Sequence, residues 1–427
     1  MHEMKDSGIA WLGNIDKRFE LKTIGNLFSI KKEIIGHDPD QVLSITQKGI
    51  KIKDTTSNEG QNAASYTHYQ IVNIGDFAMN HMDLLTGWVD ISNYQGVTSP
   101  DYRVFTLSDK KQNPEYFLRV FQMYYANRVF YAFGQGAASL GRWRLPRENF
   151  LKIAIPCPPM ELQKKINSRI NEKVCSIDAL IANQQKQIEK LKQYRQSLIT
   201  EVVKKGLNTD ITMKDSGIEW IGNIAKNHSV FRLKFLLNCP MMYGSNESGS
   251  QDSQDSVRYI RITDITTDSQ LKNDENNVYL QRTIAKDYLL KDDDVLFARS
   301  GGTVGKSFIY HSIYGESAFA GYLIKAECNH EMLLAEYLFY YTQSSLYEQW
   351  KNMIFIQSTI QNIGANKYSN MEIVIPPIDM QRRIVDYLKE KCDYIDNLIN
   401  IKAKKIKKLN QYKQSIIYEY VTGKKEV

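Results

Sequence analysis

Residues 4–15 read MKDSGIAWLGNI and residues 213–224 read MKDSGIEWIGNI, with ten identities in twelve positions. A second pair repeats in the same order, because residues 158–203 match residues 376–421 at a constant offset of 218, with 21 identities in 46 positions. The chain is therefore a tandem duplication, and each copy comprises an opening motif, a globular segment and a long helical segment. Repetition on this scale requires a function that uses two related but unequal modules.

Length and composition are those of a multidomain globular protein. The chain has 427 residues, of which 42% are hydrophobic, so it can bury more than one core. Neither an apolar run of membrane-spanning length nor an N-terminal signal pattern occurs, so we expect a soluble, cytoplasmic protein with no membrane partner. Five cysteines without C-x-x-C spacing argue against a disulfide framework and a zinc site, and the seven histidines lack metal-binding spacings.

The net charge of +7 is unevenly distributed along the chain. Residues 161–205 carry +5 and residues 378–425 carry +6, which leaves −4 for the remainder. A basic helix can follow a phosphate backbone, but a run of lysines on a helix is also typical of a solvated face. Charge alone therefore does not locate a nucleic-acid surface.

Both long repeated segments show the hydrophobic spacing of a coiled coil. Apolar residues recur at steps of three and four, which predicts a helix that packs against another helix rather than on a globular core. Pro-Pro pairs at 158–159 and 376–377 mark the helix starts, and Gly206 and Gly423 mark the ends. Polar residues interrupt the apolar pattern at four places: Gln184, Arg195, Lys402 and Lys413.

The partner that the repeat favours for the first helix is the second helix of the same chain. At about 1.5 Å per residue, each helix would be roughly 65 Å long. We predict antiparallel pairing, because it relates the two copies by a closed pseudo-twofold axis. The alternative is that both helices pair with other subunits and make the protein an assembly scaffold.

The two globular segments, residues 16–157 and 225–375, resemble each other less than their flanks do and read as mixtures of short strands and helices. Strand-like runs are 41–46, 102–107, 257–262, 295–298 and 321–326, and helix-like runs are 114–125 and 331–347. The predicted fold class is α+β, with two mixed α/β domains separated by two long helices that form an antiparallel intramolecular coiled coil. The predicted segments are 1–157 and 207–375 for the domains, and 158–206 and 376–427 for the helices.

Three elements, each present twice, carry a family resemblance. They are the opening KDSGI-x-W-[LI]-G-NI, a strand that leads into PP-x-x-x-Q-[KR]-[KR]-I, and the helix ID-x-LI…K-x-I-x-KL-x-QY-[KR]-QS-[LI]-I. In these elements, over essentially its whole length, the chain resembles the specificity subunits of type I restriction-modification systems. It departs from many members where the opening motif continues as NIDKRFELK and NIAKNHSVFRLK in place of a proline-rich turn.

The resemblance implies a function for each part of the chain. Each globular segment would be a target recognition domain that reads one half of an interrupted site in double-stranded DNA, and the helices would set the spacing. The helices would also dock two DNA methyltransferase subunits, and a translocating restriction subunit would join the larger complex. S-adenosylmethionine and ATP with magnesium would bind those partners, so we expect no cofactor and no catalytic residue in this chain.

The sequence lacks the motifs of an enzyme that acts on nucleic acid alone. Neither the Asn/Asp-Pro-Pro-aromatic loop nor the glycine-rich cofactor turn of an amino-group methyltransferase occurs. Pro100 and Asp101, followed by DKK at 109–111, form a nuclease-like pattern that arises readily by chance. The stretch GGTVGKS at 301–307 does not match a phosphate-binding loop, because Ser300 stands where that motif requires glycine.

Base reading requires hydrogen-bonding side chains on positioned loops. The glycine-rich turn that begins near residue 299 suits close approach to DNA, although an ordinary tight hairpin explains it equally well. Candidate DNA-binding residues in the first copy are Ser44, Thr46, Gln47, Lys48, His81, Gln135, Ser139, Arg142 and Arg144. Those in the second copy are Arg261, Thr263, Asp264, Arg299, Ser300, Thr303, Lys306, Gln357, Ser358, Thr359 and Gln361.

The sequence thus leads to the hypothesis of a non-catalytic DNA-recognition subunit for a bipartite, asymmetric site. One alternative is a coiled-coil scaffold without DNA binding of its own. Another is an enzyme that modifies or cleaves nucleic acid by itself.

Overall fold

A computed structural model describes residues 3–56, 63–136, 143–208, 210–266, 269–272, 276–356 and 361–427. The chain divides into two compact units. Unit 1 comprises Met1–Gln185 and Lys404–Val427, and unit 2 comprises Lys186–Ala403. Within the described ranges, no helix is both long enough and apolar enough to cross a lipid bilayer.

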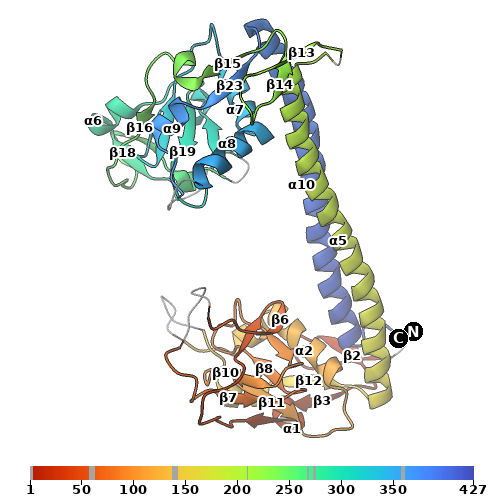
Figure 1. The fold of residues 1–427 in the computed structure, drawn as a ribbon. Helices are drawn as coiled ribbons and strands as arrows, with labels where there is room; N and C mark the ends of the chain where they lie inside the picture. The colour runs from red at the N-terminus through yellow and green to blue at the C-terminus, as the bar shows by residue number, and fades with distance from the viewer. Residues whose placement is uncertain are drawn as a thin grey trace. The chain divides into compact units, whose positions relative to one another are not determined.

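Each unit contains part of both long helices, α5 (Met160–Lys205) and α10 (Ile378–Val421), which lie side by side (Figure 1). The division into units therefore differs from the four segments read from the repeat. The reason is that each portion of a long helix packs against the globular part beside it and is grouped with that part.

Unit 1 begins with a β-hairpin and continues through short strands and helices into α5. Its elements before α5 are β1 (Met4–Asp6), β2 (Asn14–Asp16), β3 (Glu20–Thr23), α1 (Ile24–Leu27), β4 (Phe28–Lys31), β5 (Leu43–Thr46), β6 (Gly49–Ile52), β7 (Gln70–Val72), β8 (Phe77–Met79), β9 (Val89–Ile91), β10 (Gly96–Thr98), β11 (Arg103–Leu107), α2 (Pro114–Ala126), α3 (Val129–Ala132), α4 (Arg147–Lys152) and β12 (Ala154–Cys157).

Unit 2 follows the same order with different insertions. Its elements between α5 and α10 are β13 (Met213–Asp215), β14 (Asn223–Ala225), β15 (Ser229–Arg232), η1 (Leu233–Leu236), β16 (Met242–Tyr243), β17 (Ser256–Ile260), η2 (Ile262–Asp264), β18 (Tyr279–Gln281), α6 (Arg282–Ala285), η3 (Lys286–Tyr288), β19 (Val295–Ala298), β20 (Ser307–Ile309), η4 (Ser312–Tyr314), β21 (Ser317–Phe319), β22 (Leu323–Ala326), α7 (Ala335–Tyr341), α8 (Ser345–Ile356), α9 (Ala365–Ser369) and β23 (Glu372–Ile375).

Three pairings of strands recur in both units and form a common frame. The opening hairpin β1–β2 corresponds to β13–β14, and the pair β3–β12 before α5 corresponds to β15–β23 before α10. The four-stranded antiparallel sheet β4-β11-β8-β9 corresponds to β16-β22-β19-β20. The remaining sheets differ, since unit 1 adds β7–β10 and β5–β6 whereas unit 2 adds β18-β17-β21. The predicted α+β fold class is confirmed.

The expected helix over residues 331–347 is wrong in its extent. The structure has two helices there, α7 and α8, separated by residues 342–344. Ser344 explains the break, because its Oγ donates to the carbonyl of Tyr341 at 2.6 Å and accepts from the amide of Tyr347 at 3.3 Å. A serine that bonds neighbouring backbone in this way competes with helix continuation and favours a new N-terminus.

The long helices run antiparallel, as predicted. In unit 2, Arg195 Nε lies 3.2 Å from Asp396 Oδ1, and Lys402 Nζ donates to Gln187 Oε1 at 2.6 Å. Residue numbers therefore fall along α5 as they rise along α10. The predicted intramolecular coiled coil is confirmed.

Three of the four residues that interrupt the heptad pattern make polar contacts between the two helices. Arg195 and Lys402 form the two contacts above, and in unit 1 Lys413 Nζ lies 2.7 Å from Asp178 Oδ1. The fourth interruption, Gln184, is only 7% exposed. Partly exposed pairs of this kind each contribute about 1 kcal/mol or less, so their main effect is to select one register of the two helices.

A buried glutamine attaches the start of α5 to the domain beside it. Gln163 is fully buried, and its Oε1 accepts from the amide of Asn113, the N-cap residue of α2, at 2.9 Å. Its Nε2 donates to the carbonyl of Pro158 at 2.8 Å and to Gln112 Oε1 at 2.6 Å. One side chain thus satisfies polar groups on two elements at once.

The second copy repeats this attachment. Gln381, 218 positions later, accepts from the amide of Leu334 at 3.0 Å and donates to the carbonyls of Met332 at 2.8 Å and Pro376 at 3.0 Å. The glutamine of the PP-x-x-x-Q motif is therefore a structural residue in both units.

The opening hairpin packs against the C-terminal end of a long helix in each unit. In unit 1 the amide of Asp16 donates to the carbonyl of Thr422 at 3.2 Å, and Tyr418 donates to the carbonyl of Leu12 at 3.1 Å. Gly423 has φ +70°, and a Cβ atom there would lie 2.4 Å from Asp16 Cβ, so only glycine allows this contact.

In unit 2 the segment after the opening hairpin contacts the end of α5 through His228. This residue follows β14 and is fully buried. Its Nε2 lies 3.6 Å from the position that a Cβ atom of Gly206 would occupy. Burial lowers the pKa of His228 to about 4, and the carbonyls of Lys204 and Val203 oppose that shift.

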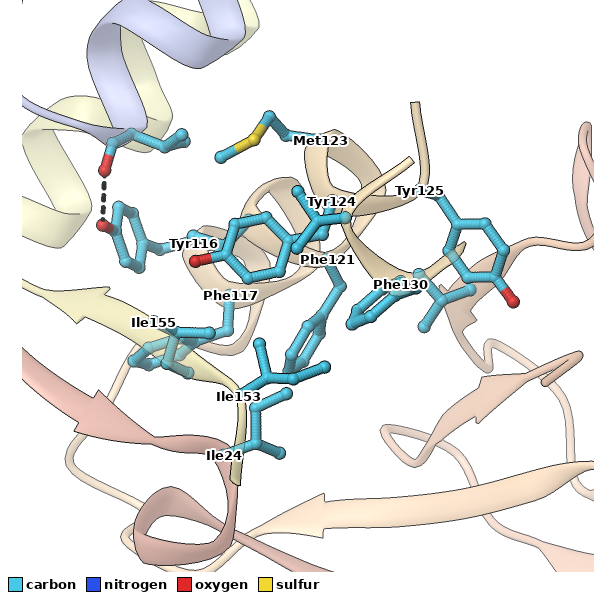
Figure 2. Packing of buried hydrophobic residues seen from close by; sticks show 14 of the residues in the cluster. Ile24, Tyr116, Phe117, Phe121, Met123, Tyr124, Tyr125, Phe130, Ile153 and Ile155 are labelled. Atoms are coloured by element: carbon cyan, nitrogen blue, oxygen red, sulfur yellow. Dashed lines mark hydrogen bonds between the residues drawn. The ribbon is translucent and has the colours of Figure 1, made fainter. Parts of the chain in front are cut away.

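Aromatic side chains fill the core of unit 1 between the sheet and α2. Figure 2 shows Phe117, Phe121 and Phe130 packed beside Ile153, with Tyr116 directed at the end of α10. Tyr116 is fully buried and donates to the carbonyl of Val421 at 3.0 Å. The core of unit 1 therefore extends without a break from the domain onto the helical pair.

We expect Gln163→Leu and Gln381→Leu each to lower the free energy of unfolding by about 2–4 kcal/mol, because each leaves a buried amide and a buried carbonyl without a partner. Denaturant unfolding measures this loss. The matched control is Gln193→Leu at an exposed position of α5, where we expect a change within about 0.5 kcal/mol. Equal effects of all three substitutions would contradict the role given to the buried glutamines.

We expect the free energy of unfolding to decrease as the pH is lowered from 6.5 to 5, in part because of His228. Its folded pKa lies below its unfolded value, so the unfolded state binds more protons in this window and stability rises with pH, by at most about 1.4 kcal/mol per pH unit. His228→Phe, which introduces the residue found at the equivalent position of the first copy, Phe19, should flatten this slope in urea unfolding measured at several pH values. An unchanged slope would show that another group causes the pH dependence.

Candidate nucleic-acid interface

The glycine-rich turn of unit 2 is a tight hairpin between β19 and β20. The amide of Ala298 donates to the carbonyl of Lys306 at 2.8 Å, and the amide of Gly305 donates to the carbonyl of Ala298 at 3.0 Å. Gly301 and Gly305 have φ of +80° and +82°, a conformation that favours glycine. Because the turn joins two strands, it does not form the strand-to-helix cradle of a phosphate-binding loop.

Two buried tyrosines donate hydrogen bonds to backbone carbonyls of this turn. Tyr368 donates to the carbonyl of Ala298 at 2.8 Å, and Tyr347 donates to the carbonyl of Gly305 at 2.5 Å. Burial raises the pKa of both hydroxyls far above the ordinary value, so both remain protonated donors. The turn is therefore fixed to the core while its tip, Gly301 and Gly302, is exposed.

Arg299 is oriented by three neighbours. Its amide donates to the carbonyl of Tyr322 at 2.9 Å, and its carbonyl accepts from the amide of Ile363 at 2.9 Å. Its guanidinium carbon lies 5.1 Å from the ring centroid of Tyr243, within the range of a cation–π contact. The side chain thus has a defined position beside the turn.

Arg261 and Asp264 bind each other. The guanidinium donates to both carboxylate oxygens, at 3.1 Å from Nε and 2.9 Å from the terminal nitrogen, and the amide of Arg261 donates to the same carboxylate at 2.8 Å. Asp264 is 8% exposed, so its carboxylate is directed at Arg261 rather than at solvent. Thr263 between them is exposed, and its carbonyl accepts from Lys272 Nζ at 2.6 Å.

A hollow of about 860 Å³ brings four of the predicted residues of unit 2 together: Arg261, Thr263, Arg299 and Ser300. Residues 245–249, Tyr322 and Asn362 line the same hollow. A neighbouring hollow of about 660 Å³ shares Thr263 and adds Thr303 and Lys272. Lys306 is half-buried and lines neither hollow, and Gln361 is exposed next to Asn362.

Unit 1 has a hollow of about 610 Å³ beside the ends of β8 and β11, and Ser44 lines it together with Asn80, Asp83 and Trp143. The other predicted residues of this loop form a turn. Thr46 donates to the carbonyl of Gly49 at 2.9 Å and accepts from the amide of Lys48 at 3.1 Å.

Gln47 and Lys48 are exposed at the tip of that turn. Gln47 Nε2 donates to the carbonyl of Thr86 at 3.2 Å, which ties the turn to the loop that follows His81.

His81 is half-buried beside two arginines. Burial, together with the cations Arg103 and Arg144, lowers the pKa of His81 to about 3, so the ring is neutral at physiological pH. Arg103 is 5% exposed and donates to the carbonyl of Leu145 at 2.8 Å. Of the two arginines, Arg144 alone is exposed and can reach a ligand.

Gln135 pairs with Arg144 through two backbone hydrogen bonds, at 2.8 and 3.0 Å, and both side chains are exposed. Trp143, which precedes Arg144, lines the hollow of unit 1. Five predicted residues lie outside the described parts of the chain: Ser139, Arg142, Gln357, Ser358 and Thr359.

Sequence reasoning missed two residues that line the larger hollow and one that contacts Arg299 beside it. Tyr322 is 62% exposed, Tyr243 carries the guanidinium of Arg299, and Asn362 lies on the wall of the larger hollow. Asn362 belongs to the stretch QSTIQNI that matches SLGRWRL of the first copy, so the repeat alignment contained a signal for it.

Asp292, Asp293 and His311 also lie together, with one ligand atom from each within 4.8 Å of the others. The spacing of these residues in the sequence did not predict this group. Exposed acidic groups of this kind are common in proteins without a metal, and the residues lie outside both hollows.

We expect Gly244→Ala to lower the free energy of unfolding by about 1–3 kcal/mol, because its Cβ would lie 2.2 Å from the carbonyl oxygen of Phe319 and 2.5 Å from that of Ala320, on the wall of the larger hollow. Gly302→Ala is the matched control, since no heavy atom of the described chain lies within 4 Å of its Cβ position. Thermal unfolding measures the stability of both variants. An equal loss of stability in the two would contradict the packing described for Gly244.

Comparisons with known proteins agree on one family. The family described as Type I restriction modification DNA specificity domain matches residues 238–423. The chain is similar to the MjaVIII specificity subunit of a type I restriction enzyme from Methanocaldococcus jannaschii, with 26% identity over 285 residues, which are 64% of this chain and 63% of that protein. It is also 21% identical over 441 residues to the putative MjaX specificity subunit of the same organism, covering 97% of this chain and 95% of that one.

A solved structure shares the fold over nearly the whole chain. It comes from work entitled "Structural basis underlying complex assembly and conformational transition of the type I R-M system", with a TM-score of 0.68 and 13% identity, covering 95% of this chain and 98% of that one. The duplicated motifs and these relatives lead to one conclusion: residues 238–423 match the type I restriction modification DNA specificity domain, and the chain is similar to type I restriction enzyme specificity subunits.

Proposed function

We propose that this chain is the DNA-sequence recognition subunit of a type I restriction-modification complex. Each unit reads one half of a bipartite, asymmetric site in double-stranded DNA. The observation that carries the proposal is the repeated sheet frame, which presents different side chains from equivalent loops, namely His81 and Arg144 in unit 1 and Arg299 in unit 2. Two recognition domains that share one sheet frame but carry different loop side chains suit a DNA site whose two halves differ in sequence.

Affinity for DNA comes largely from phosphate contacts, and base edges supply the specificity. The exposed cations beside the hollows serve the first purpose, and the hydrogen-bonding groups on the hollow walls serve the second. The candidate contacts within the described chain are Ser44, Thr46, Gln47, Lys48, His81, Gln135, Arg144, Arg261, Thr263, Asp264, Arg299, Ser300, Thr303, Lys306 and Gln361.

The chain itself performs no chemistry in this proposal. Two methyltransferase subunits dock on the paired helices α5 and α10, and restriction subunits complete the assembly in the cytoplasm. S-adenosylmethionine and ATP with magnesium bind to those partners. The helical pair, 46 and 44 residues long, sets the spacing between half-sites, which we expect to lie about one turn of DNA apart.

We expect that exchange of residues 16–157 for those of a family member with a different target will change one half of the methylated sequence and leave the other half as it was. The methylated positions are mapped in DNA from cells that express the hybrid with its methyltransferase subunits. Exchange of the helix at 158–206 is the control, and it should leave the bases of both half-sites unchanged. An unaltered methylated sequence after the domain exchange would refute the proposal.

Binding of the assembled complex to its site should weaken steeply with salt, by about 10³-fold or more between 50 and 200 mM for six or more phosphate contacts. A coiled-coil scaffold without DNA affinity predicts no salt-sensitive binding at all. Methyl transfer or cleavage by the purified chain alone would instead identify an enzyme.

A further inference from the structure

We propose that Asn362 reads an adenine base in the half-site of unit 2, and that it does so from the position that Arg144 occupies in unit 1. The inference rests on the proposed function and names one specificity-determining residue for it. Three observations carry it: the equivalence of two backbone sites, an unpaired buried oxygen on a residue that lines the larger hollow, and the fixed surroundings of that residue.

The two units place these residues by the same backbone hydrogen bond. In unit 1 the amide of Leu145 donates to the carbonyl of His81 at 2.9 Å, and in unit 2 the amide of Ile363 donates to the carbonyl of Arg299 at 2.9 Å. Donors and acceptors are both separated by 218 positions, the offset of the sequence repeat. The residue before each donor, Arg144 or Asn362, therefore occupies an equivalent site next to the end of β8 or β19.

The side chain of Asn362 has an unsatisfied acceptor in this site. Its Oδ1 is buried and has no hydrogen-bond partner among the described residues. Asn362 lines the hollow of about 860 Å³ together with Arg299, Ser300 and Tyr322. A buried carboxamide oxygen without a partner is unfavourable in the free protein, so the position favours a ligand that donates a hydrogen bond.

The surroundings of Asn362 are held by contacts within unit 2. Its backbone pairs with that of Ser300, and three residues later the amide of Ala365 donates to the hydroxyl of Tyr243 at 2.9 Å. The ring of Tyr243 in turn supports the guanidinium of Arg299. These contacts connect the segment that carries Asn362 to the hairpin turn, which limits the conformational entropy lost on binding.

The other polar groups of the hollow are less suited to this role. The guanidinium of Arg261 is occupied by Asp264, and the serines of residues 245–249 lie in a loop in which Ser245 Oγ accepts from the amide of Glu247 at 3.2 Å. Asn362 differs from these groups because its Oδ1 has no partner among the described residues.

The chemistry of a carboxamide selects the base. In the major groove adenine presents an amino donor at N6 and an acceptor at N7, which match the oxygen and the amino group of asparagine. An arginine at the same site, as in unit 1, matches the two acceptors of guanine. Arg144 and Asn362 thus occupy equivalent backbone sites but prefer different bases. An asymmetric DNA site requires such a difference between its two half-sites.

The test uses the complex of the full chain with its methyltransferase subunits and duplexes that carry the mapped site. We expect Asn362→Ala to weaken binding by about 5- to 150-fold and to relax discrimination at a single A·T pair of the half-site of unit 2. Discrimination at the half-site of unit 1 is the internal control and should not change. Asn366→Ala, at an exposed position four residues away, should bind DNA as the wild type does.

A modified base tests whether Asn362 contacts N7 of the adenine. At the A·T pair identified by Asn362→Ala, replacement of adenine by 7-deazaadenine should weaken binding by the wild-type complex and have little further effect on the variant. Asn362→Asp, which preserves the shape of the side chain, should also lose preference for adenine, and its use guards against a folding defect in the alanine variant.

The outcomes separate the two proposals. If the complex recognises a bipartite site but neither substitution alters discrimination at an A·T pair in the half-site of unit 2, this inference is wrong and the proposed function stands. If the wild-type complex shows no sequence preference in DNA, the proposed function fails and this inference fails with it.

Discussion

One buried glutamine in each copy connects the long helix to the domain beside it, and the remaining structure of each unit depends on that connection. Gln163 and Gln381 each satisfy a backbone amide at the start of a domain helix and the carbonyl of the first proline before the long helix. An apolar residue would fill the space but would leave those groups unpaired in the core. Hydrogen bonds of this kind are directional, so they orient the helix as well as stabilise it.

The same sheet frame with different insertions explains how one architecture supports two readers. The four-stranded sheets β4-β11-β8-β9 and β16-β22-β19-β20 pair their strands in the same order, and the polar loops leave the sheets at equivalent points. The frame depends on buried aromatic and aliphatic residues, whereas the loops depend largely on hydrogen bonds to neighbouring segments.

The repeat made the large features of the fold predictable from the sequence. The offset of 218 located both long helices, and the heptad pattern predicted that each has a helical partner, because a narrow apolar stripe requires one. The pseudo-twofold symmetry of the repeat predicted that the two helices run antiparallel. The break between α7 and α8 was missed, since it depends on the hydrogen bonds of Ser344 rather than on apolar periodicity. The strand 295–298 was predicted with its observed bounds, because it is a continuous apolar run between turn residues.

The candidate site was less predictable than the fold. Residue types indicated that Arg261 and Arg299 suit DNA, but only the structure shows that Asp264 occupies the guanidinium of Arg261 while Tyr243 supports that of Arg299. Tyr243 and Asn362 lie more than a hundred positions apart in the chain. The hydroxyl of Tyr243 accepts from the amide of Ala365, three residues after Asn362. Contacts between such distant residues depend on how the loops pack, and a single sequence carries no direct signal of that packing.

The order of synthesis and the order of completion differ in this chain. The opening hairpin of unit 1 is made first, yet the backbone of Asp16 bonds to Thr422 and the hydroxyl of Tyr116 bonds to Val421. Unit 2 is continuous from Lys186 to Ala403, so its opening hairpin and the end of α5 are made one after the other. On the ribosome the opening hairpin of unit 1 therefore lacks these partners until the last turn of α10 is released, so unit 1 is begun before unit 2 and completed after it.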